Sequence, residues 1–326
     1  MGRTFYVVLQ NPKGIVWAGD VLSGTAILET DEDIKMNGLF IEVNGEGNVH
    51  WVEKVRAEQG RTKKVHYKNA ERYFSEKITL IEEKTGGSTT LTPGTYKYPF
   101  EYKLPEKLPA SFDGQHGKTK YTIKATFDIP WGFDLVTNKA FIVLRRMDLN
   151  KIPDAALGQS ASDAKSLCCL CCTSGPITAT MSIPRTGYTP GESIPITASA
   201  NNQSNREMDV TFSLDQTIVY KASNKTKRAI STVKKMTKKG LPEKKEEVFT
   251  DVGFKVPGLP PSFLNGCSII DIRYKLKMKI DPYGPAIDIC LPLDIIIGNV
   301  ALNNVKLAYN DDNAAFDTTN ESNQSK

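Results

Sequence analysis

The sequence contains no apolar run long enough to cross a membrane as a helix. The best candidate among its 326 residues, 286–302, is interrupted by Asp288, Pro292 and Asp294, whereas a spanning helix needs about 20 consecutive apolar residues. Near the N-terminus only residues 5–9 form an apolar run, which is too short for a signal peptide. Tyr6 stands where an N-myristoylation motif has Ser or Thr. We therefore expect a cytosolic protein.

Groups that could carry catalysis are scarce. The sequence has three histidines, His50, His66 and His116, and no Gly-x-Ser-x-Gly motif. The run Gly-Lys-Thr at 117–119 resembles the end of a phosphate-binding loop, but Phe112 occupies the position of that loop's first glycine. A strand pattern follows it, where the loop requires a helix. We therefore expect no enzyme, no cofactor and no metal site.

Cysteine is absent from the first 167 residues. Four of the six cysteines lie within five consecutive positions and two are isolated: Cys168, Cys169, Cys171 and Cys172, then Cys267 and Cys290. A secreted domain held by disulfides would distribute its cysteines over its whole core. We therefore expect reduced thiols in a reducing compartment.

The cysteine cluster at 168–172 has the composition of a strand. Because side chains alternate along a strand, Cys168 and Cys172 would face one side, and Cys169 and Cys171 the other. One extended segment cannot place four thiolates around one ion. We predict a strand that is buried on both faces, in which cysteine packs as a small apolar residue. S-acylation of the four cysteines, and metal or redox chemistry, stay open as alternatives.

Alternating apolar and polar residues dominate the first half of the sequence, and each run ends at Gly, Pro, Asn or Asp. Such runs are typical of short antiparallel strands. They cover residues 21–28, 39–43, 76–81, 120–127 and 140–144. No apolar stripe with helical spacing persists for three turns, so we expect no long helix.

A second series of strand patterns follows a polar stretch of small residues at 150–164, which we interpret as an inter-domain linker. Each half has the size of a β-sandwich domain. After the second series, residues 303–326 are rich in Asn and Asp, which predicts a disordered tail. The patterns of the second series cover residues 176–182, 193–200, 208–214, 217–221, 248–256, 268–280 and 287–297.

Basic residues concentrate in one segment, 221–245. It has ten Lys or Arg and one acid, Glu243, and therefore carries +9, whereas the whole chain carries +5. Such a patch attracts phosphoinositides, an anionic membrane or a phosphorylated segment. Nucleic acid is not expected, because no aromatic residue lies between the lysines to stack bases. The residues that we expect to contact an acidic membrane are Lys234, Lys235, Lys238 and Lys239. A solvated hairpin whose lysines protect an edge strand is the alternative.

Several segments, taken in order, resemble the arrestin-domain proteins of the α-arrestin class, in the group that includes thioredoxin-interacting proteins. The resemblance covers residues 1 to about 300 and depends on the order and spacing of the segments, not on one motif. They are Pro-Phe-Glu-Tyr at 99–102, Pro-Ala-Ser-Phe-Asp-Gly at 109–114, Tyr-Thr-Ile-Lys-Ala at 121–125, the cysteine-rich 165–176, Gly-Tyr-Thr-Pro-Gly-Glu-Ser-Ile at 187–194, Cys-Ser-Ile-Ile at 267–270 and Leu-Pro-Leu at 291–293.

The resemblance implies an all-β fold of two immunoglobulin-like β-sandwiches. The arrestin N-terminal domain would be 1–149, the linker 150–164, the arrestin C-terminal domain 165–302 and the disordered tail 303–326. It implies a non-enzymatic cytosolic adaptor that binds cytoplasmic parts of membrane receptors or transporters at the plasma membrane or endosomes. Such adaptors direct protein transport, in endocytosis and endosomal sorting, and are linked in many relatives to ubiquitination. The alternative is an arrestin-fold scaffold, or competitor, that occupies cargo without recruiting a ubiquitin ligase.

The sequence departs from relatives at three places. It has no Pro-Pro-x-Tyr motif for the WW domains of HECT ubiquitin ligases, so recruitment of such a ligase is doubtful. The nearest match, Pro-Pro-Ser-Phe at 260–263, is expected to enter the strand that follows. The first strand, 5–9, lacks the lysine pair with which visual and β-arrestins sense phosphate. Gln203 stands where a thioredoxin-interacting relative has its thioredoxin-pairing cysteine, so redox coupling there is not expected.

Overall fold

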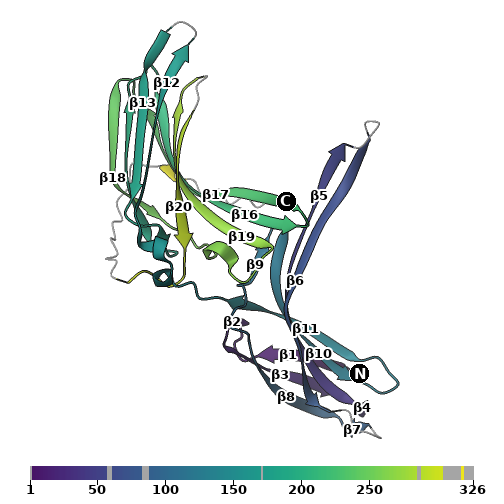
Figure 1. Cartoon of the computed structure of the whole chain (residues 1–326). Coiled ribbons are helices and arrows are strands. Elements are labelled where there is room, and N and C mark those ends of the chain that lie inside the picture. Colours follow the sequence, from purple (N-terminus) through teal and green to yellow (C-terminus); the bar gives the residue numbers. More distant parts are fainter. Residues whose placement is uncertain are drawn as a thin grey trace. The chain divides into compact units, whose positions relative to one another are not determined.

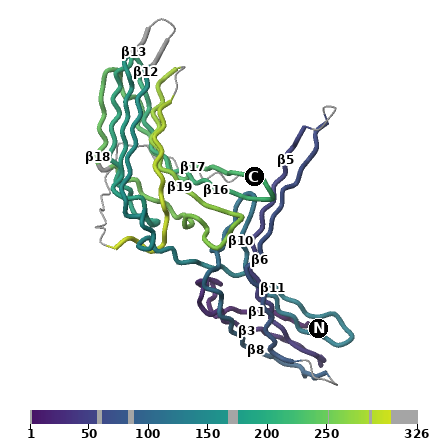
Figure 2. The backbone as a smooth tube through the Cα atoms, viewed as in Figure 1, coloured from purple at the N-terminus to yellow at the C-terminus, as the bar shows by residue number. Residues whose placement is uncertain are grey.

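The computed structural model describes residues 2–56, 61–82, 88–169, 172–284, 288–303 and 317–318. The chain divides into two compact units, each built on β-sheets, as Figure 1 and Figure 2 show. The prediction of an all-β fold with two arrestin-like sandwich domains is confirmed. Unit 1 comprises Met1–Arg145, Val219–Lys227 and Leu264–Asp271, and unit 2 comprises Arg146–Ile218, Arg228–Phe263 and Ile272–Lys326.

Unit 1 contains a three-stranded sheet in the order β1-β3-β8 and a six-stranded sheet in the order β2-β11-β10-β5-β6, in which β9 also pairs with β10. The short strands β4 and β7 form a separate pair. The strands are β1 (Arg3–Leu9), β2 (Ile15–Trp17), β3 (Val21–Thr30), β4 (Ile34–Met36), β5 (Gly38–Arg56), β6 (Thr62–Ile81), β7 (Thr89–Leu91), β8 (Gly94–Lys103), β9 (Phe112–Gly114), β10 (Gly117–Asp128) and β11 (Leu135–Leu144).

Alternate residues of these strands form the core of unit 1. Leu22 and Leu28 of β3 are buried, and so are Tyr121, Ile123 and Phe127 of β10, all in one apolar cluster. The spacing of two is the strand periodicity read in the sequence. The hydroxyl of Tyr121 donates to the carbonyl oxygen of residue 109 at 2.6 Å, so the buried ring leaves no polar group unsatisfied.

The strands β5 and β6 are much longer than their sequence patterns predicted. They continue as a two-stranded ribbon (Figure 1). On this ribbon the rings of Trp51 and Tyr67, which are cross-strand partners, stack with centroids 5.4 Å apart. His50 Nε2 lies 3.1 Å from His66 Nδ1. The outer part of the ribbon has many exposed polar residues, so it lacks the buried alternation that identifies a strand.

Unit 2 repeats the plan with a four-stranded sheet in the order β12-β13-β15-β18 and a six-stranded sheet in the order β14-β20-β19-β16-β17-β21. In both units a short strand pairs in parallel with a long one, β2 with β11 and β14 with β20. The strands are β12 (Gln159–Cys169), β13 (Cys172–Ile183), β14 (Gly187–Tyr188), β15 (Ser193–Asn202), β16 (Met208–Ala222), β17 (Lys225–Leu241), β18 (Lys245–Lys255), β19 (Ile270–Pro282), β20 (Ile289–Ile297) and β21 (Asp317–Thr318).

The prediction of separate strands at 208–214 and 217–221 is wrong, because β16 runs through both. The polar residues between them are satisfied inside the sheet. Asp215 accepts a hydrogen bond from Thr232, and the Gln216 amide donates to the hydroxyl of Tyr274 at 2.9 Å. A polar pair therefore interrupts the apolar pattern without ending the strand.

The stretch interpreted as a linker, 150–164, contains regular structure. It holds part of the 3-10 turn η2 (Leu149–Lys151), the 3-10 turn η3 (Pro153–Ala156) and the start of β12 at Gln159. Because β12 is an edge strand made of small polar residues, its pattern resembled that of a linker. Of the predicted tail, 303–326, the structure describes only residue 303 and β21, which pairs with β17.

Helices are confined to 3-10 turns in the described part of the chain, the third being η4 (Ser262–Leu264). Within that part, no helix combines the length and the apolar character needed to span a bilayer.

Candidate functional site

A polar hollow of about 570 Å³ lies on the six-stranded sheet of unit 2. It follows from strand alternation: Met208, Val210 and Phe212 of β16 face the core, so their neighbours face the other side. The same holds for β19, where Leu276 and Met278 are buried and the residues between them line the hollow. The lining side chains are Asp209, Thr211, Ser213 and Asp215 of β16, Thr232, Lys235, Thr237 and Lys239 of β17, Lys277, Lys279 and Asp281 of β19, and Asp288 and Cys290.

Two of the four lysines in the hollow are paired with carboxylates. Lys277 Nζ lies 2.8 Å from Asp215 Oδ2, and this hydrogen bond raises the pKa of Lys277. Lys279 Nζ lies 2.8 Å from Asp288 and 3.0 Å from Asp281, which raises the pKa of Lys279. The same contact with Lys279 lowers the pKa of Asp288. These lysines are therefore neutralised within the hollow.

Lys235 and Lys239 of β17 are different. Both side chains line the hollow and both are exposed. Among the described residues neither makes an ion pair. They are two positive charges on β17 that an anionic group could reach without displacing a carboxylate.

Lys234 and Lys238 project from the opposite face of β17. Lys234 Nζ donates to the carbonyl oxygen of Lys255 at 2.8 Å and lies 4.8 Å from the ring centroid of Phe254. Burial lowers the pKa of Lys234. Lys238 Nζ is 2.5 Å from Glu247. Both contacts lead to β18, so the four lysines predicted as one patch divide into two pairs with different surroundings.

The cysteine cluster does not lie on one strand, and that interpretation is wrong. The chain reverses direction inside the cluster: β12 ends at Cys169, β13 begins at Cys172, and these two are Cα partners in an antiparallel hairpin. Cys168 pairs with Thr173, whereas Cys171 lies outside the described residues. Residues 168–172 contain no Gly, Pro, Asn or Asp that would have indicated a reversal of the chain.

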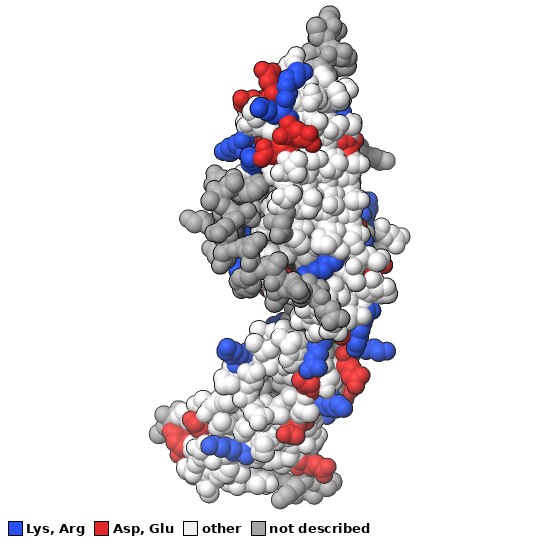
Figure 3. Space-filling model, turned by 90° about the vertical axis from the view of Figure 1, so that its left-hand side faces the viewer, with Lys and Arg blue, Asp and Glu red and all other residues white. Residues whose placement is uncertain are grey.

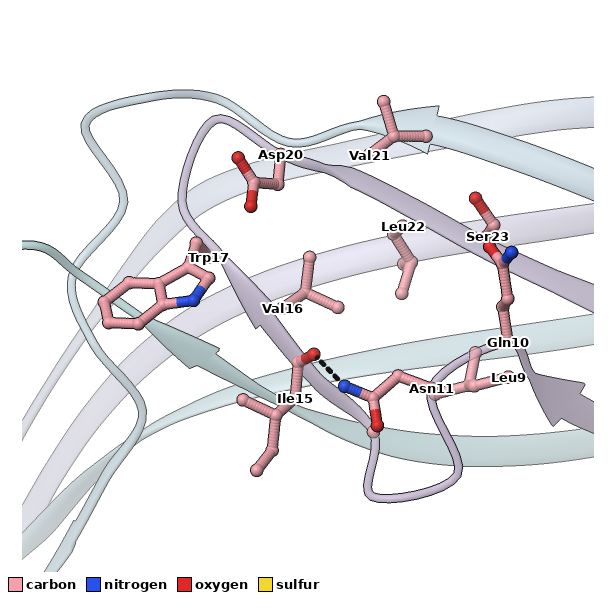
Figure 4. A pocket seen from close by; sticks show the side chains of 11 residues that line it. Leu9, Gln10, Asn11, Ile15, Val16, Trp17, Asp20, Val21, Leu22 and Ser23 are labelled. Carbon is pink, nitrogen blue, oxygen red and sulfur yellow. Dashed lines mark hydrogen bonds between the residues drawn. The ribbon is translucent and has the colours of Figure 1, made fainter.

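A second pocket, of about 270 Å³, lies in unit 1 where β1, β2 and β3 meet (Figure 4). Leu9 and Leu22 form its buried wall. The amide of Asn11 donates to the carbonyl oxygen of Ile15 at 2.8 Å and closes the loop beside it. Among the described residues of its lining Asp20 is the only ionisable one, and these residues form no acid–base pair. Sequence patterns did not indicate it, because its residues come from three strand ends.

The Pro-Pro-Ser-Phe segment at 260–263 is part of the folded structure and enters the turn η4, so the prediction that it enters a strand is wrong. The carbonyl oxygen of Pro260 accepts a hydrogen bond from Tyr274 at 2.7 Å. Ser262 is buried and its hydroxyl accepts from the amide of Ile297 at 2.9 Å. Phe263 packs on a small apolar cluster of unit 2. A segment held in this way is not an extended ligand for a WW domain.

Charges of both signs are mixed on the face of the molecule in Figure 3, where basic and acidic side chains are interspersed on a largely uncharged surface. No group of three or more His, Cys, Asp or Glu side chains in the described ranges could hold a metal ion.

Comparison with known proteins gives matches along the folded part of the chain. Residues 5–150 match the family described as the N-terminal domain of arrestin (or S-antigen), and residues 173–302 match the C-terminal domain of the same family. Arrestin domain-containing protein 17 of Caenorhabditis elegans is 28% identical over 310 residues, which are 91% of this chain and 70% of that protein. Mouse arrestin domain-containing protein 4 is 30% identical over 292 residues, 88% of this chain and 69% of the relative. Rat arrestin domain-containing protein 1 is 31% identical over 240 residues, 73% of this chain and 53% of the relative.

Proposed function

The chain belongs to the arrestin family, in the α-arrestin class of arrestin domain-containing proteins, and we propose that it directs the transport of membrane proteins. In this role it binds the cytoplasmic parts of receptors or transporters and carries them into endocytosis or endosomal sorting. The observation that carries the proposal is the match to both arrestin domains, which together cover most of the folded chain. Arrestin-family proteins are generally non-enzymatic adaptors, and the proposal requires no catalytic group.

Contact with the membrane is assigned in this proposal to Lys235 and Lys239. They are exposed and lie on one face of β17. They share the hollow with Thr211 and Thr237, whose hydroxyls are 3.1 Å apart, so one of the two donates to the other and the second can donate to a phosphate oxygen. Lys234 and Lys238 contribute less, because their ammonium groups already contact β18. The chain resides in the cytoplasm and reaches the plasma membrane or endosomes through this contact and its cargo.

Proximity labelling in cells tests the adaptor role. The intact chain should enrich plasma-membrane and endosomal proteins over a cytosolic control. The variant K235E/K239E should lose most of this enrichment, whereas K118E/K120E, which changes the same charge at two exposed lysines of β10, should keep it. If the intact chain enriches no membrane protein, the adaptor proposal fails.

The second candidate is an arrestin-fold scaffold or competitor that occupies cargo without delivering a ligase. It is favoured by the absence of Pro-Pro-x-Tyr from the sequence and by the folded state of residues 260–263. A pull-down with isolated WW domains of HECT ligases separates the two candidates. Capture at micromolar affinity would revive direct ligase recruitment, and a Phe263→Ala chain shows whether residues 260–263 are responsible.

The cysteine hairpin remains a candidate for lipidation at Cys168, Cys169, Cys171 and Cys172. Acylation of a protein that already contacts a membrane adds a second anchor, and stable membrane attachment requires two. Acyl groups that are released by hydroxylamine and absent from the variant with all four cysteines replaced by Ser would establish it. A Cys290→Ser chain is the matched control, because that thiol is exposed and lies outside the cluster.

A further inference from the structure

The loop between β10 and β11, residues 129–134, presents two aromatic side chains to solvent. Trp131 has a relative exposure of 107% and Phe133 of 96%, the highest among the exposed large apolar residues in the described ranges. Residues 130–133, Pro-Trp-Gly-Phe, contain no charged side chain. Exposing two large aromatic side chains to water costs free energy, so their exposure points to a binding role.

The loop is held at its base. Ile129 and Leu135 pack against the core cluster of unit 1, one at each end of the loop. The amide of Gly132 donates to the carbonyl oxygen of Ile129 at 3.2 Å, and the amide of Ile129 donates to Asp134 Oδ1 at 3.2 Å. The two rings therefore project from a closed turn, and part of the backbone that would enter an apolar layer is already hydrogen-bonded.

The backbone at Trp131 is strained. Its φ is 59°, in the left-handed region that a bulky L-residue rarely adopts. Glycine adopts this region without strain, yet here it is Trp131, and not the following Gly132, that does so. Strain of this kind persists where the surrounding structure fixes it, and it often marks a site of function. Here it occurs in the loop that joins β10 and β11, at a residue whose side chain is fully exposed (Figure 2).

The charges on the loop and its flanking residues select the partner. Between residues 125 and 138 the chain has no Lys, Arg or His, and its two charged residues are Asp128 and Asp134. Asp128 is fixed by a hydrogen bond from the Asn37 amide at 3.2 Å. Carboxylates beside aromatic rings attract a quaternary ammonium group and repel an anionic surface. Trp is also the side chain most suited to the boundary between headgroups and acyl chains.

We propose that Trp131 and Phe133 insert into the interface of a zwitterionic, choline-bearing lipid layer. The proposal rests on the adaptor function, which brings unit 1 to a membrane, and it assigns to this loop a contact that is independent of the lysines of unit 2. Insertion of two rings is shallow and reversible, because binding of this type scales with the apolar area that is buried.

Vesicle sedimentation tests the proposal. The full chain should bind phosphatidylcholine vesicles equally at about 0.1 M and 0.5 M salt, because screening at these concentrations weakens contacts between exposed charges but not apolar burial. We expect W131S/F133S to bind at least tenfold more weakly. V8S/I142S, which removes two exposed apolar side chains from strands of the same unit, should bind as the wild type does. No binding by the wild type, or equal binding by W131S/F133S, would overturn the proposal.

Fluorescence places the indole directly. The chain has three tryptophans, and W17F/W51F leaves Trp131 as its single indole. Its emission should shift to shorter wavelength when phosphatidylcholine vesicles are added, and brominated lipid should quench it. If W17F/W51F does not fold, the difference between the wild type and W131F reports the same signal. An unshifted emission with saturating vesicles contradicts insertion.

The outcomes also separate this proposal from the adaptor function. K235E/K239E should bind phosphatidylcholine vesicles normally. Suppose that the wild type does not bind vesicles and that W131S/F133S no longer enriches a membrane protein that the wild type enriches in proximity labelling. The tip then binds a pocket of that protein, so the lipid proposal is overturned and the adaptor function stands. Binding restricted to anionic vesicles and abolished by 0.5 M salt would likewise overturn it.

Discussion

Lys234 and Lys235 are neighbours on β17 and project to opposite faces of the strand. Lys234 donates to the carbonyl oxygen of Lys255 at 2.8 Å, whereas Lys235 lines the polar hollow. The strand geometry thus converts a continuous basic run into two surfaces with different electrostatic surroundings. This division decides which lysines are offered to an anionic partner.

The ion pair between Asp215 and Lys277 stabilises the hollow. The Asp215 side chain is 11% exposed and also accepts from Thr232 at 2.7 Å. We expect Asp215→Asn to lower the free energy of unfolding by about 1–3 kcal/mol, because it removes a charged acceptor from two donors. Asp294→Asn is the control: Asp294 pairs with Lys275 but is 70% exposed, so the change should stay within about 0.5 kcal/mol. Urea unfolding measures both, and equal effects would contradict the assignment.

Asp288 makes the stability of the folded state depend on pH in the acid range. Its pKa is lowered by the hydrogen bond from Lys279, so the contact stabilises the folded state above the unfolded pKa of about 4. This contribution is lost as pH falls through the lowered folded value. We expect the Tm of the wild type to decline more between pH 5 and 2, roughly the window of carboxylate titration, than that of Asp288→Asn. Parallel Tm curves for the two chains would argue against this contact.

Cys267 should be slow to alkylate. Burial raises the pKa of its thiol, which lies beside Tyr73 in unit 1, whereas the side chain of Cys290 is exposed. Because the thiolate is the reactive form, we expect iodoacetamide to modify Cys290 at least tenfold faster than Cys267 at about pH 8. Peptide mass spectrometry of the native chain resolves the two sites. Similar rates would show that Cys267 is accessible.

Gly45 allows two rings to approach β5. A Cβ there would lie 2.6 Å from Phe74 Cε1 and 2.7 Å from Tyr121 Cε1. Gly45→Ala should therefore cost about 1–3 kcal/mol of stability through overpacking. Gly258→Ala is the control, since its Cβ would meet nothing within 4 Å. If Gly45→Ala leaves the free energy of unfolding unchanged, the two rings move aside to admit the methyl group.

The sequence predicted the fold where one face of a strand is buried. Patterns at 21–28 and 120–127 became β3 and β10, because their alternate residues pack in the core of unit 1. Segments without such a face were missed. The outer ribbon of β5 and β6, and the edge strand β12, show little or no apolar alternation, so their strand pairing could not be read from hydrophobic periodicity.

The candidate site was predicted in part. The basic run indicated a charged surface, whereas the alternative of an edge strand does not fit β17, which lies between β16 and the two-residue β21 in its sheet. The sequence could not show that Asp215 and Asp288 neutralise Lys277 and Lys279, because these partners meet only through the order of the strands. The Trp131 and Phe133 tip was missed for another reason: exposure of an aromatic residue depends on tertiary packing.

Vesicle binding measures whether Lys235 and Lys239 bring this chain to an anionic membrane. The measured quantity is the gain in vesicle affinity when phosphatidylserine is added to phosphatidylcholine, at low and at physiological salt. We expect a gain that weakens with salt, that K235E/K239E loses and that K118E/K120E keeps. An equal gain in all three chains, or none in the wild type, would contradict it.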